Sequence, residues 1–217
     1  VPLIGFSGSP WTLATYMVEG GSSKAFAKIK SMIYGDPQTA HLLLDKLADA
    51  VIDYLNAQIE SGAQAVQIFD TWGGVLAPEM FRAFSLRYLE KIVNGVRRSY
   101  DGKSIPVVVF CKGCNAPLGA GAVTGCDGWG GEWRRRRGEA GAGVGARVSL
   151  QGNLDPAIML TNPAIIETQV KATLASFGKG HGHVFNLGHG ITPEVDPHHM
   201  TVLTKSVRDH SPAWHKD

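Results

Sequence analysis

Short apolar runs alternate with segments of helical periodicity along this chain, and the alternation restricts the folds that it can adopt. The apolar runs, each bounded by turn residues, occupy residues 2–6, 63–69, 105–110, 147–152 and 183–186, with a weaker run at 126–130. Strands that alternate with helices over short connections form βα units and a parallel sheet. The six units of this α/β pattern fit either an open doubly wound sheet or an incomplete (β/α)8 barrel, whose complete form has about 250 residues.

Two helices are predicted by apolar residues that recur three and four positions apart. The longer one follows Asp36 and ends at Ser61, and its expected inward-facing residues are Leu42, Leu43, Leu47, Val51, Tyr54, Leu55 and Ile59. The other runs from Pro78 to Arg98, and its expected inward-facing residues are Phe81, Phe84, Leu89, Ile92 and Val96.

The composition suits a single domain over residues 1–217, because 44% of the residues are hydrophobic and can fill a core. A net charge of +2 gives no reason to expect nucleic acid or an anionic membrane as a partner. No apolar run approaches the ~18 residues of a membrane span. The chain begins with Val1 instead of Met, so we expect a fragment.

The cysteines are three in number, which argues against a disulfide framework and for a reducing compartment. Two of them, Cys111 and Cys114, form a single C-x-x-C pair. Without a second pair the spacing is weak evidence for zinc, and Gly113 argues against a helix that starts between them, as a thioredoxin-like motif requires. We interpret the pair as structural or incidental and predict no metal site.

Residues 5–21 combine the end of a strand, a tight turn and a short helix. Ser9 can cap this helix, Pro10 suits its first position, and Gly20 can end it. The resulting loop leaves backbone N–H groups at the carboxyl end of a strand, close to Trp11 and Tyr16, where parallel α/β folds bind ligands. An ordinary βα loop explains the glycines equally well.

This stretch also carries a resemblance. It reads Gly-Phe-Ser-Gly-Ser-Pro-Trp-Thr-Leu and then Tyr-Met-Val-Glu-Gly-Gly, whereas residues 186–197 read Asn-Leu-Gly-His-Gly-Ile-Thr-Pro-Glu-Val-Asp-Pro. Both stretches resemble signatures of the uroporphyrinogen decarboxylase family. The resemblance implies a (β/α)8 TIM-type barrel that is incomplete at the N-terminus, of which this chain is about the C-terminal two-thirds.

The resemblance further implies an activity. Members of the family remove CO2 from the four acetate side chains of uroporphyrinogen III to give coproporphyrinogen III in porphyrin, heme and chlorophyll biosynthesis. They use no metal or organic cofactor, because the pyrrole ring serves as the electron sink. The implied partners are the tetrapyrrole substrate and a second subunit in a homodimer. The implied compartment is the plastid in a photosynthetic eukaryote and the cytoplasm otherwise.

Four residues match positions that act in the family. Tyr16 and His189 are expected to be catalytic and to bind substrate, and Phe6 and Thr71 are expected to bind substrate. Thr71 stands where the family usually has serine, and it keeps the hydroxyl group. The essential aspartate and arginines of the family lie upstream of the opening signature, so an isolated piece is expected to be inactive.

Two alternatives remain open. One is a corrinoid-linked zinc methyltransferase of the same barrel superfamily, which binds zinc through an H-x-C pair, but residue 109 before Phe110 and Cys111 is valine and not histidine. The other is an inactive truncated remnant. Residues 119–145 depart from the family pattern, with glycines at expected strand positions and four consecutive arginines.

Overall fold

The computed structural model describes residues 2–21, 23–114, 124–131 and 148–215. The chain divides into two compact units, Val1–Gly128 and Trp129–Asp217, and each is described by itself. The expected single domain therefore stays a prediction. Most of the unusual segment at 119–145 lies outside the described residues.

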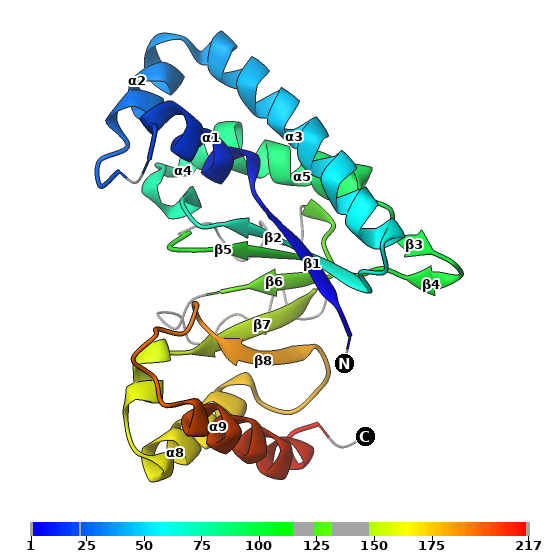
Figure 1. Ribbon diagram of the computed structural model, residues 1–217, viewed down its shortest axis with the longest axis vertical. Coiled ribbons are helices and arrows are strands. Elements are labelled where there is room, and N and C mark those ends of the chain that lie inside the picture. The colour runs from blue at the N-terminus through cyan, green and yellow to red at the C-terminus, as the bar shows by residue number, and fades with distance from the viewer. Residues whose placement is uncertain (1, 22, 115–123, 132–147, 216–217) are drawn as a thin grey trace. The chain divides into compact units, whose positions relative to one another are not determined.

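Three parallel strands form the sheet of the first unit: β1 (Ile4–Gly8), β2 (Ala65–Asp70) and β5 (Val107–Cys111), in the order β1-β2-β5 (Figure 1). The central strand β2 pairs Val66 with Gly5 on one side and with Val107 on the other. Ile68 and Val109 are completely buried, as apolar strands covered on both faces should be. The three carboxyl ends meet at one edge of the sheet, because the strands are parallel.

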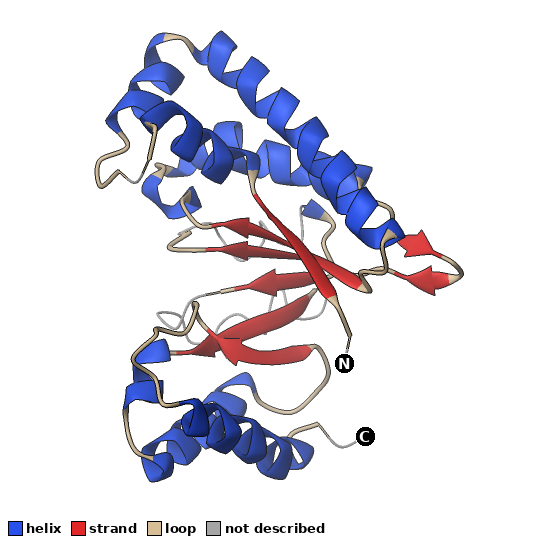
Figure 2. Ribbon diagram, viewed as in Figure 1, coloured by secondary structure: helices blue, strands red, loops and turns tan. Residues whose placement is uncertain are grey.

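The helices of this unit pack against its strands and against each other (Figure 2). They are α1 (Pro10–Glu19), α2 (Ala27–Gly35), α3 (Pro37–Glu60), α4 (Pro78–Phe81) and α5 (Arg87–Gly95). The helix expected from Pro78 to Arg98 is thus shorter and divided, since a π-helical segment (Arg82–Leu86) separates α4 from α5. After Gly95 the chain enters a small hairpin, β3 (Ser99–Tyr100) and β4 (Lys103–Ser104), which the sequence did not predict.

The buried face of α3 differs from the predicted one. Its buried residues are Ala40, Leu44, Ala48, Val51, Leu55 and Ile59. Leu42 and Tyr54, expected to face inward, are 71% and 58% exposed. The physical reason is that alanines complete the buried stripe: Ala40 and Ala48 keep its helical spacing and let neighbouring helices approach closely. By contrast, all five residues expected to face inward after Pro78 are buried.

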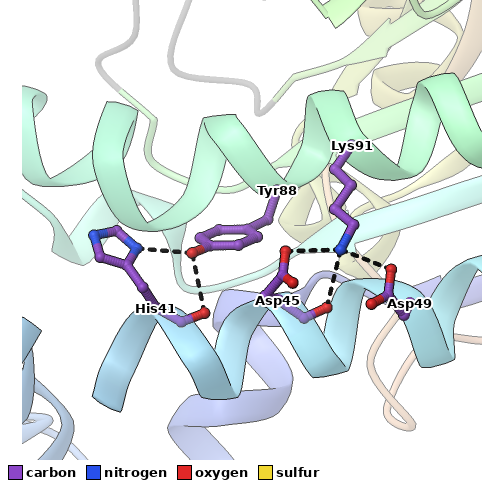
Figure 3. Close-up of polar contacts among 5 residues, drawn as sticks. All are labelled: His41, Asp45, Asp49, Tyr88 and Lys91. Atoms are coloured by element: carbon purple, nitrogen blue, oxygen red, sulfur yellow. Dashed lines mark hydrogen bonds and ion pairs between the residues drawn. The ribbon is translucent and has the colours of Figure 1, made fainter. Parts of the chain in front are cut away.

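Polar side chains connect α3 and α5 where these two helices pack together (Figure 3). The Lys91 ammonium lies 2.7 Å from carboxylate oxygens of both Asp45 and Asp49. One helical turn away along α5, the Tyr88 hydroxyl lies 2.7 Å from Nδ1 of His41. Exposed ion pairs contribute little to stability, so we expect these two contacts of Lys91 to add little to the packing of the two helices.

The second unit repeats the pattern. Its strands are β6 (Gly128–Gly130), β7 (Ser149–Leu154) and β8 (His183–Leu187), in the order β6-β7-β8, and β6 begins at the last residue of the first unit. Strands β7 and β8 are parallel. Its helices are α8 (Pro163–Phe177) and α9 (Pro197–His210). Their core with the strands consists of Leu154, Met159, Ile166, Val170, Leu174, Val195 and Leu203.

Both units therefore consist of βα segments, and the predicted α/β class is confirmed. The weak apolar run at 126–130 does form a strand, β6. Among the helices that the structure describes, none has the length and apolar character needed to cross a membrane.

Candidate active site

The connection from β1 to α1 has the local structure that its sequence predicts. Ser9 caps the helix, because its Oγ accepts a hydrogen bond from the Thr12 N–H at 3.1 Å. Pro10 occupies the first turn, where a missing N–H costs nothing. Gly20 ends the helix with a φ of 78°, a left-handed conformation that glycine adopts without strain.

Asp70, the last residue of β2, is completely buried beside this connection. Its Oδ1 accepts hydrogen bonds from Ser9 Oγ at 2.7 Å and from Thr12 Oγ1 at 3.1 Å. Its Oδ2 accepts a hydrogen bond from Ser85 Oγ in the π-helical segment. Burial raises the pKa of the Asp70 carboxyl, although these three hydrogen bonds act in the opposite direction. One carboxyl group thus joins three separate segments of the chain.

The loop after Asp70 contacts the same helix. The Trp11 indole Nε1 donates a hydrogen bond to the carbonyl oxygen of Trp72 at 2.9 Å, and the Trp72 N–H donates to Thr12 Oγ1 at 3.3 Å. Thr71 is half-buried, and its neighbours Asp70 and Trp72 are both hydrogen-bonded to residues at the start of α1. The predicted substrate-binding residue Thr71 therefore belongs to a loop that is hydrogen-bonded to α1.

Tyr16 lies on α1 and faces this loop. Its ring meets the Trp72 ring edge-on, with the centroids 6.5 Å apart, and 43% of the residue is exposed. Phe26 packs against Trp72 at 4.9 Å between centroids, and the Lys112 ammonium lies 5.6 Å from the centroid of the same ring. The structure therefore brings Tyr16 and the loop that carries Thr71 together.

Phe6 lies on β1, and it is 62% exposed. Its ring meets that of Phe69 at right angles, with 5.9 Å between centroids. Its backbone N–H and carbonyl oxygen both bond to the Gln58 side chain, at 2.8 and 3.0 Å. An apolar ring so exposed can cover a ligand, and its role in a pocket stays a prediction.

His189 follows β8 in the second unit, and it is exposed. The preceding residue, Gly188, is anchored by its N–H to the Leu154 carbonyl oxygen at 2.7 Å. Nδ1 of His189 accepts a hydrogen bond from the Gly190 N–H at 2.7 Å. In the neutral ring this assignment leaves the hydrogen on Nε2. Tyr16, Thr71 and Phe6 all belong to the first unit.

Sulfur atoms lie next to the Asp70 carboxyl. Cys111 and Cys114 are joined as a disulfide. Only in the reduced form could the two sulfurs and the Asp70 carboxyl act as metal ligands, and these three ligand atoms lie within 4.8 Å of one another. The number of cysteines argued against a disulfide framework. The structure differs in one respect, because Cys111 and Cys114, three positions apart, form one local bridge. Cys126 is buried outside this pair, and burial raises the pKa of its thiol.

Sequence reasoning missed Asp70 and Ser85 as members of the site. An aspartate at the end of a strand followed by a loop was visible, but it equally fits a residue that caps the loop. Its complete burial and its three hydroxyl donors distinguish Asp70 from a residue that only caps the loop, and these features appear only in the folded chain.

Parallel βα units, with polar loops at the carboxyl ends of the strands, define a class of α/β enzyme folds that includes the (β/α)8 barrels. A methyltransferase from Methanosarcina mazei has a similar structure, with a TM-score of 0.81 over 96% of this chain and 59% of that chain, at 22% sequence identity. At that identity the likeness shows the fold alone.

The family follows from the sequence comparisons. Residues 1–210 match the model of the family "Uroporphyrinogen decarboxylase (URO-D)", and the chain belongs to this family. Proteins named uroporphyrinogen decarboxylase are 58% identical over 216 residues in Hydrogenovibrio crunogenus and 56% identical over 216 residues in Pseudoalteromonas translucida. Each match covers 100% of this chain and 61% of the relative. The family resemblance and the incomplete barrel-type fold are thereby confirmed.

Proposed function

We propose that this chain is part of a uroporphyrinogen decarboxylase, a carboxy-lyase that converts uroporphyrinogen III to coproporphyrinogen III by removing CO2 from four acetate side chains. The observation that carries the proposal is an identity of 58% to a protein of that name, sustained over 216 residues. The matched region covers the opening loop, where the described side chains form one connected polar and aromatic cluster.

The chemistry needs few groups from the protein. Protonation of a pyrrole α-carbon makes the ring an electron sink, and CO2 leaves from an acetate on that ring. A proton then replaces CO2 on the methylene carbon, and the α-carbon releases its added proton to restore the pyrrole. Tyr16 carries an exposed phenol that can donate a hydrogen bond to a substrate carboxylate or relay a proton. The Thr71 hydroxyl can bind a second carboxylate from a loop that Trp11 and Thr12 hold in place.

His189 supplies the other proposed polar group. Its Nδ1 accepts a hydrogen bond from the Gly190 N–H, and its exposed ring would bind a carboxylate or transfer a proton. The exposed ring of Phe6 would cover the apolar face of a pyrrole. Asp70 would act as a positioning residue, because its contacts fix the start of α1 and not the substrate.

The proposal includes the remaining expectations. The reaction proceeds without a metal or an organic cofactor, the substrate is a tetrapyrrole, and the enzyme works as a homodimer. Nucleic acid and membrane are not partners. Since the relatives named above come from bacteria, we place the enzyme in the cytoplasm; nothing favours the plastid that was expected for a photosynthetic eukaryote.

The test is decarboxylation of enzymatically prepared uroporphyrinogen III by two proteins. One is this 217-residue chain, and the other adds the part of the H. crunogenus relative that the chain does not match, since the chain spans 61% of that protein. We expect coproporphyrinogen from the longer protein alone. A folded longer protein that releases no CO2 would refute the proposal. Methyl transfer with bound zinc would then favour the corrinoid-linked alternative, and the lack of any activity would favour an inactive remnant.

A further inference from the structure

Two cysteines at the end of β5 lie in a geometry that the proposed reaction does not use. Cys111 is the last residue of the strand and is 4% exposed, whereas Cys114 is half-buried in the loop that follows. Their Cα atoms are 5.7 Å apart, inside the usual range for a disulfide, and the two residues are bonded. The bridge closes a loop of only four residues, so it contributes little to the stability of the whole chain.

The loop between the two sulfurs packs closely against the loop that carries Thr71. The Lys112 N–H donates to the Asp70 carbonyl oxygen at 3.2 Å, and the Lys112 carbonyl oxygen accepts from the Gly74 N–H at 3.1 Å. Gly113 adopts a φ of 64°. A change in the bonding of the two sulfurs would therefore act on a loop whose backbone is hydrogen-bonded to the Asp70–Gly74 segment.

We propose that Cys111 and Cys114 form a reversible redox pair that a small disulfide, such as glutathione disulfide, oxidises. One protein thiolate attacks the small disulfide and forms a mixed disulfide, and one small thiol leaves. The second protein thiolate then attacks the protein sulfur of that mixed disulfide and expels the second small thiol. The protein loses two protons and two electrons, and the small disulfide gains both as two thiols.

The surroundings assign the two roles. Cys114 is the more accessible sulfur, so it meets the small disulfide first. Cys111 is too buried for that encounter and is the residue that closes the bridge. Its Sγ lies 3.7 Å from Asp70 Oδ2, at the end of the strand next to β5.

Oxidation should also be visible at Trp72. Its ring is the one beneath the Lys112 ammonium, and Lys112 lies between the two cysteines. Bridge formation would shift the cation relative to the indole, so we expect a change in tryptophan fluorescence between the oxidised and reduced protein. The same change should be absent from the Trp72→Phe variant, which keeps an aromatic ring but removes the reporter.

The test equilibrates the folded chain with mixtures of reduced and oxidised glutathione, then quenches with acid, alkylates and maps the products by mass spectrometry. We expect Cys111 and Cys114 to lose their thiols together, in a single transition, with a bond between them. Cys126 should stay reduced throughout, because it is buried outside the pair.

Serine variants separate the roles and provide controls. Cys111→Ser should accumulate a glutathione adduct on Cys114, since the closing thiol is gone. Cys114→Ser should react with glutathione disulfide at least about tenfold more slowly than the unchanged chain, because the remaining thiol of the pair, Cys111, is buried. Cys126→Ser should behave as the unchanged chain, and circular dichroism should show the same helix content in all three.

Three results would overturn the proposal. The first is alkylation of both thiols at every glutathione ratio. The second is a bridge that forms only after unfolding in urea. The third is protection of both thiols by stoichiometric Zn²⁺ in a chain that glutathione disulfide alone leaves reduced, because Asp70, Cys111 and Cys114 would then act as metal ligands. None of these measurements depends on decarboxylation, so the redox pair and the proposed function stand or fall separately.

Discussion

The Ser9 hydroxyl donates a hydrogen bond of 2.7 Å to the Asp70 carboxylate, across 61 residues of sequence. The same hydroxyl oxygen accepts from the Thr12 N–H and caps α1. One serine therefore links the start of the helix that carries Tyr16 to the end of the strand that precedes Thr71. The Ser9 hydroxyl therefore connects the elements that carry Tyr16 and Thr71, two proposed substrate-binding residues.

Replacing Asp70 should destabilise the fold. In Asp70→Asn the amide oxygen can still accept from Ser9 and Thr12, but the NH2 group can only donate, so the Ser85 hydroxyl must turn and accept instead. The free energy of unfolding should fall by about 1–3 kcal/mol, because the three hydroxyl groups no longer donate together to one buried carboxyl. Ser85→Ala, which removes only the donor, should cost about 1 kcal/mol. Urea unfolding measures both, and an unchanged midpoint for Asp70→Asn would show that the carboxyl is dispensable.

Local features of this site were predictable from sequence, whereas long-range ones were not. The cap at Ser9 and the end of α1 at Gly20 depend on residues within one or two turns, and both were predicted. Asp70 was not recognised because its donors come from α1 and from Ser85, and no local pattern specifies which hydroxyl groups a buried carboxyl will meet.

The same distinction explains the errors in the helices. Leucine spacing predicts that residues 37–60 are helical, but Leu42 is exposed because Ala40 and Ala48 occupy the buried stripe. Alanine carries little hydrophobic signal, and its suitability for a close helix contact appears only after packing. The hairpin after Gly95 likewise consists of two-residue strands, which are too short for an alternating pattern. The α/β class was predictable because it depends on the order of many elements.

Acid should weaken the contact between α3 and α5 through His41 (Figure 3). The ring stacks on Phe84 with 4.5 Å between centroids, and desolvation, followed by the charge of Arg87, lowers the pKa of His41 below its ordinary value of 6.5. The unfolded chain then binds the proton more readily than the folded one. Stability should be fully present above about pH 6.5 and should decrease as the pH falls toward the lowered pKa.

The matched control is His41→Gln, which keeps a polar group near Tyr88 but does not titrate. Its stability should vary less with pH between about 6.5 and 5 than that of the unchanged chain, in urea titrations at constant ionic strength. Equal slopes for the two proteins across that range would assign the acid sensitivity to other groups.

Gly74 should not tolerate a side chain. A Cβ there would lie 2.5 Å from the Lys112 carbonyl oxygen and from the carbonyl carbon of Gly113, both backbone atoms of the β5 loop. Gly74→Ala would push the two loops apart, and we expect it to lower the free energy of unfolding by about 1–3 kcal/mol. Gly35→Ala is the control, because a Cβ at that helix end meets nothing within 4 Å. A loss at Gly35 equal to that at Gly74 would refute the steric explanation.

Tyr16 offers the sharpest test of the proposed chemistry, in the longer protein that carries the upstream segment. Tyr16→Phe keeps the edge-on contact with Trp72 and removes only the hydroxyl. If that hydroxyl binds a substrate carboxylate or relays a proton, kcat/KM for uroporphyrinogen III should fall about tenfold to a thousandfold, with unchanged unfolding.

The control for Tyr16 is Tyr34→Phe, because Tyr34 is an exposed tyrosine on α2 outside the site. It should leave kcat/KM within about twofold, since a surface hydroxyl far from the substrate affects neither binding nor proton transfer. A drop in kcat alone for Tyr16→Phe would indicate an interaction made in the transition state, whereas a rise in KM alone would indicate carboxylate binding. Full activity in Tyr16→Phe would remove Tyr16 from the reaction and leave the aromatic contact with Trp72 as its role.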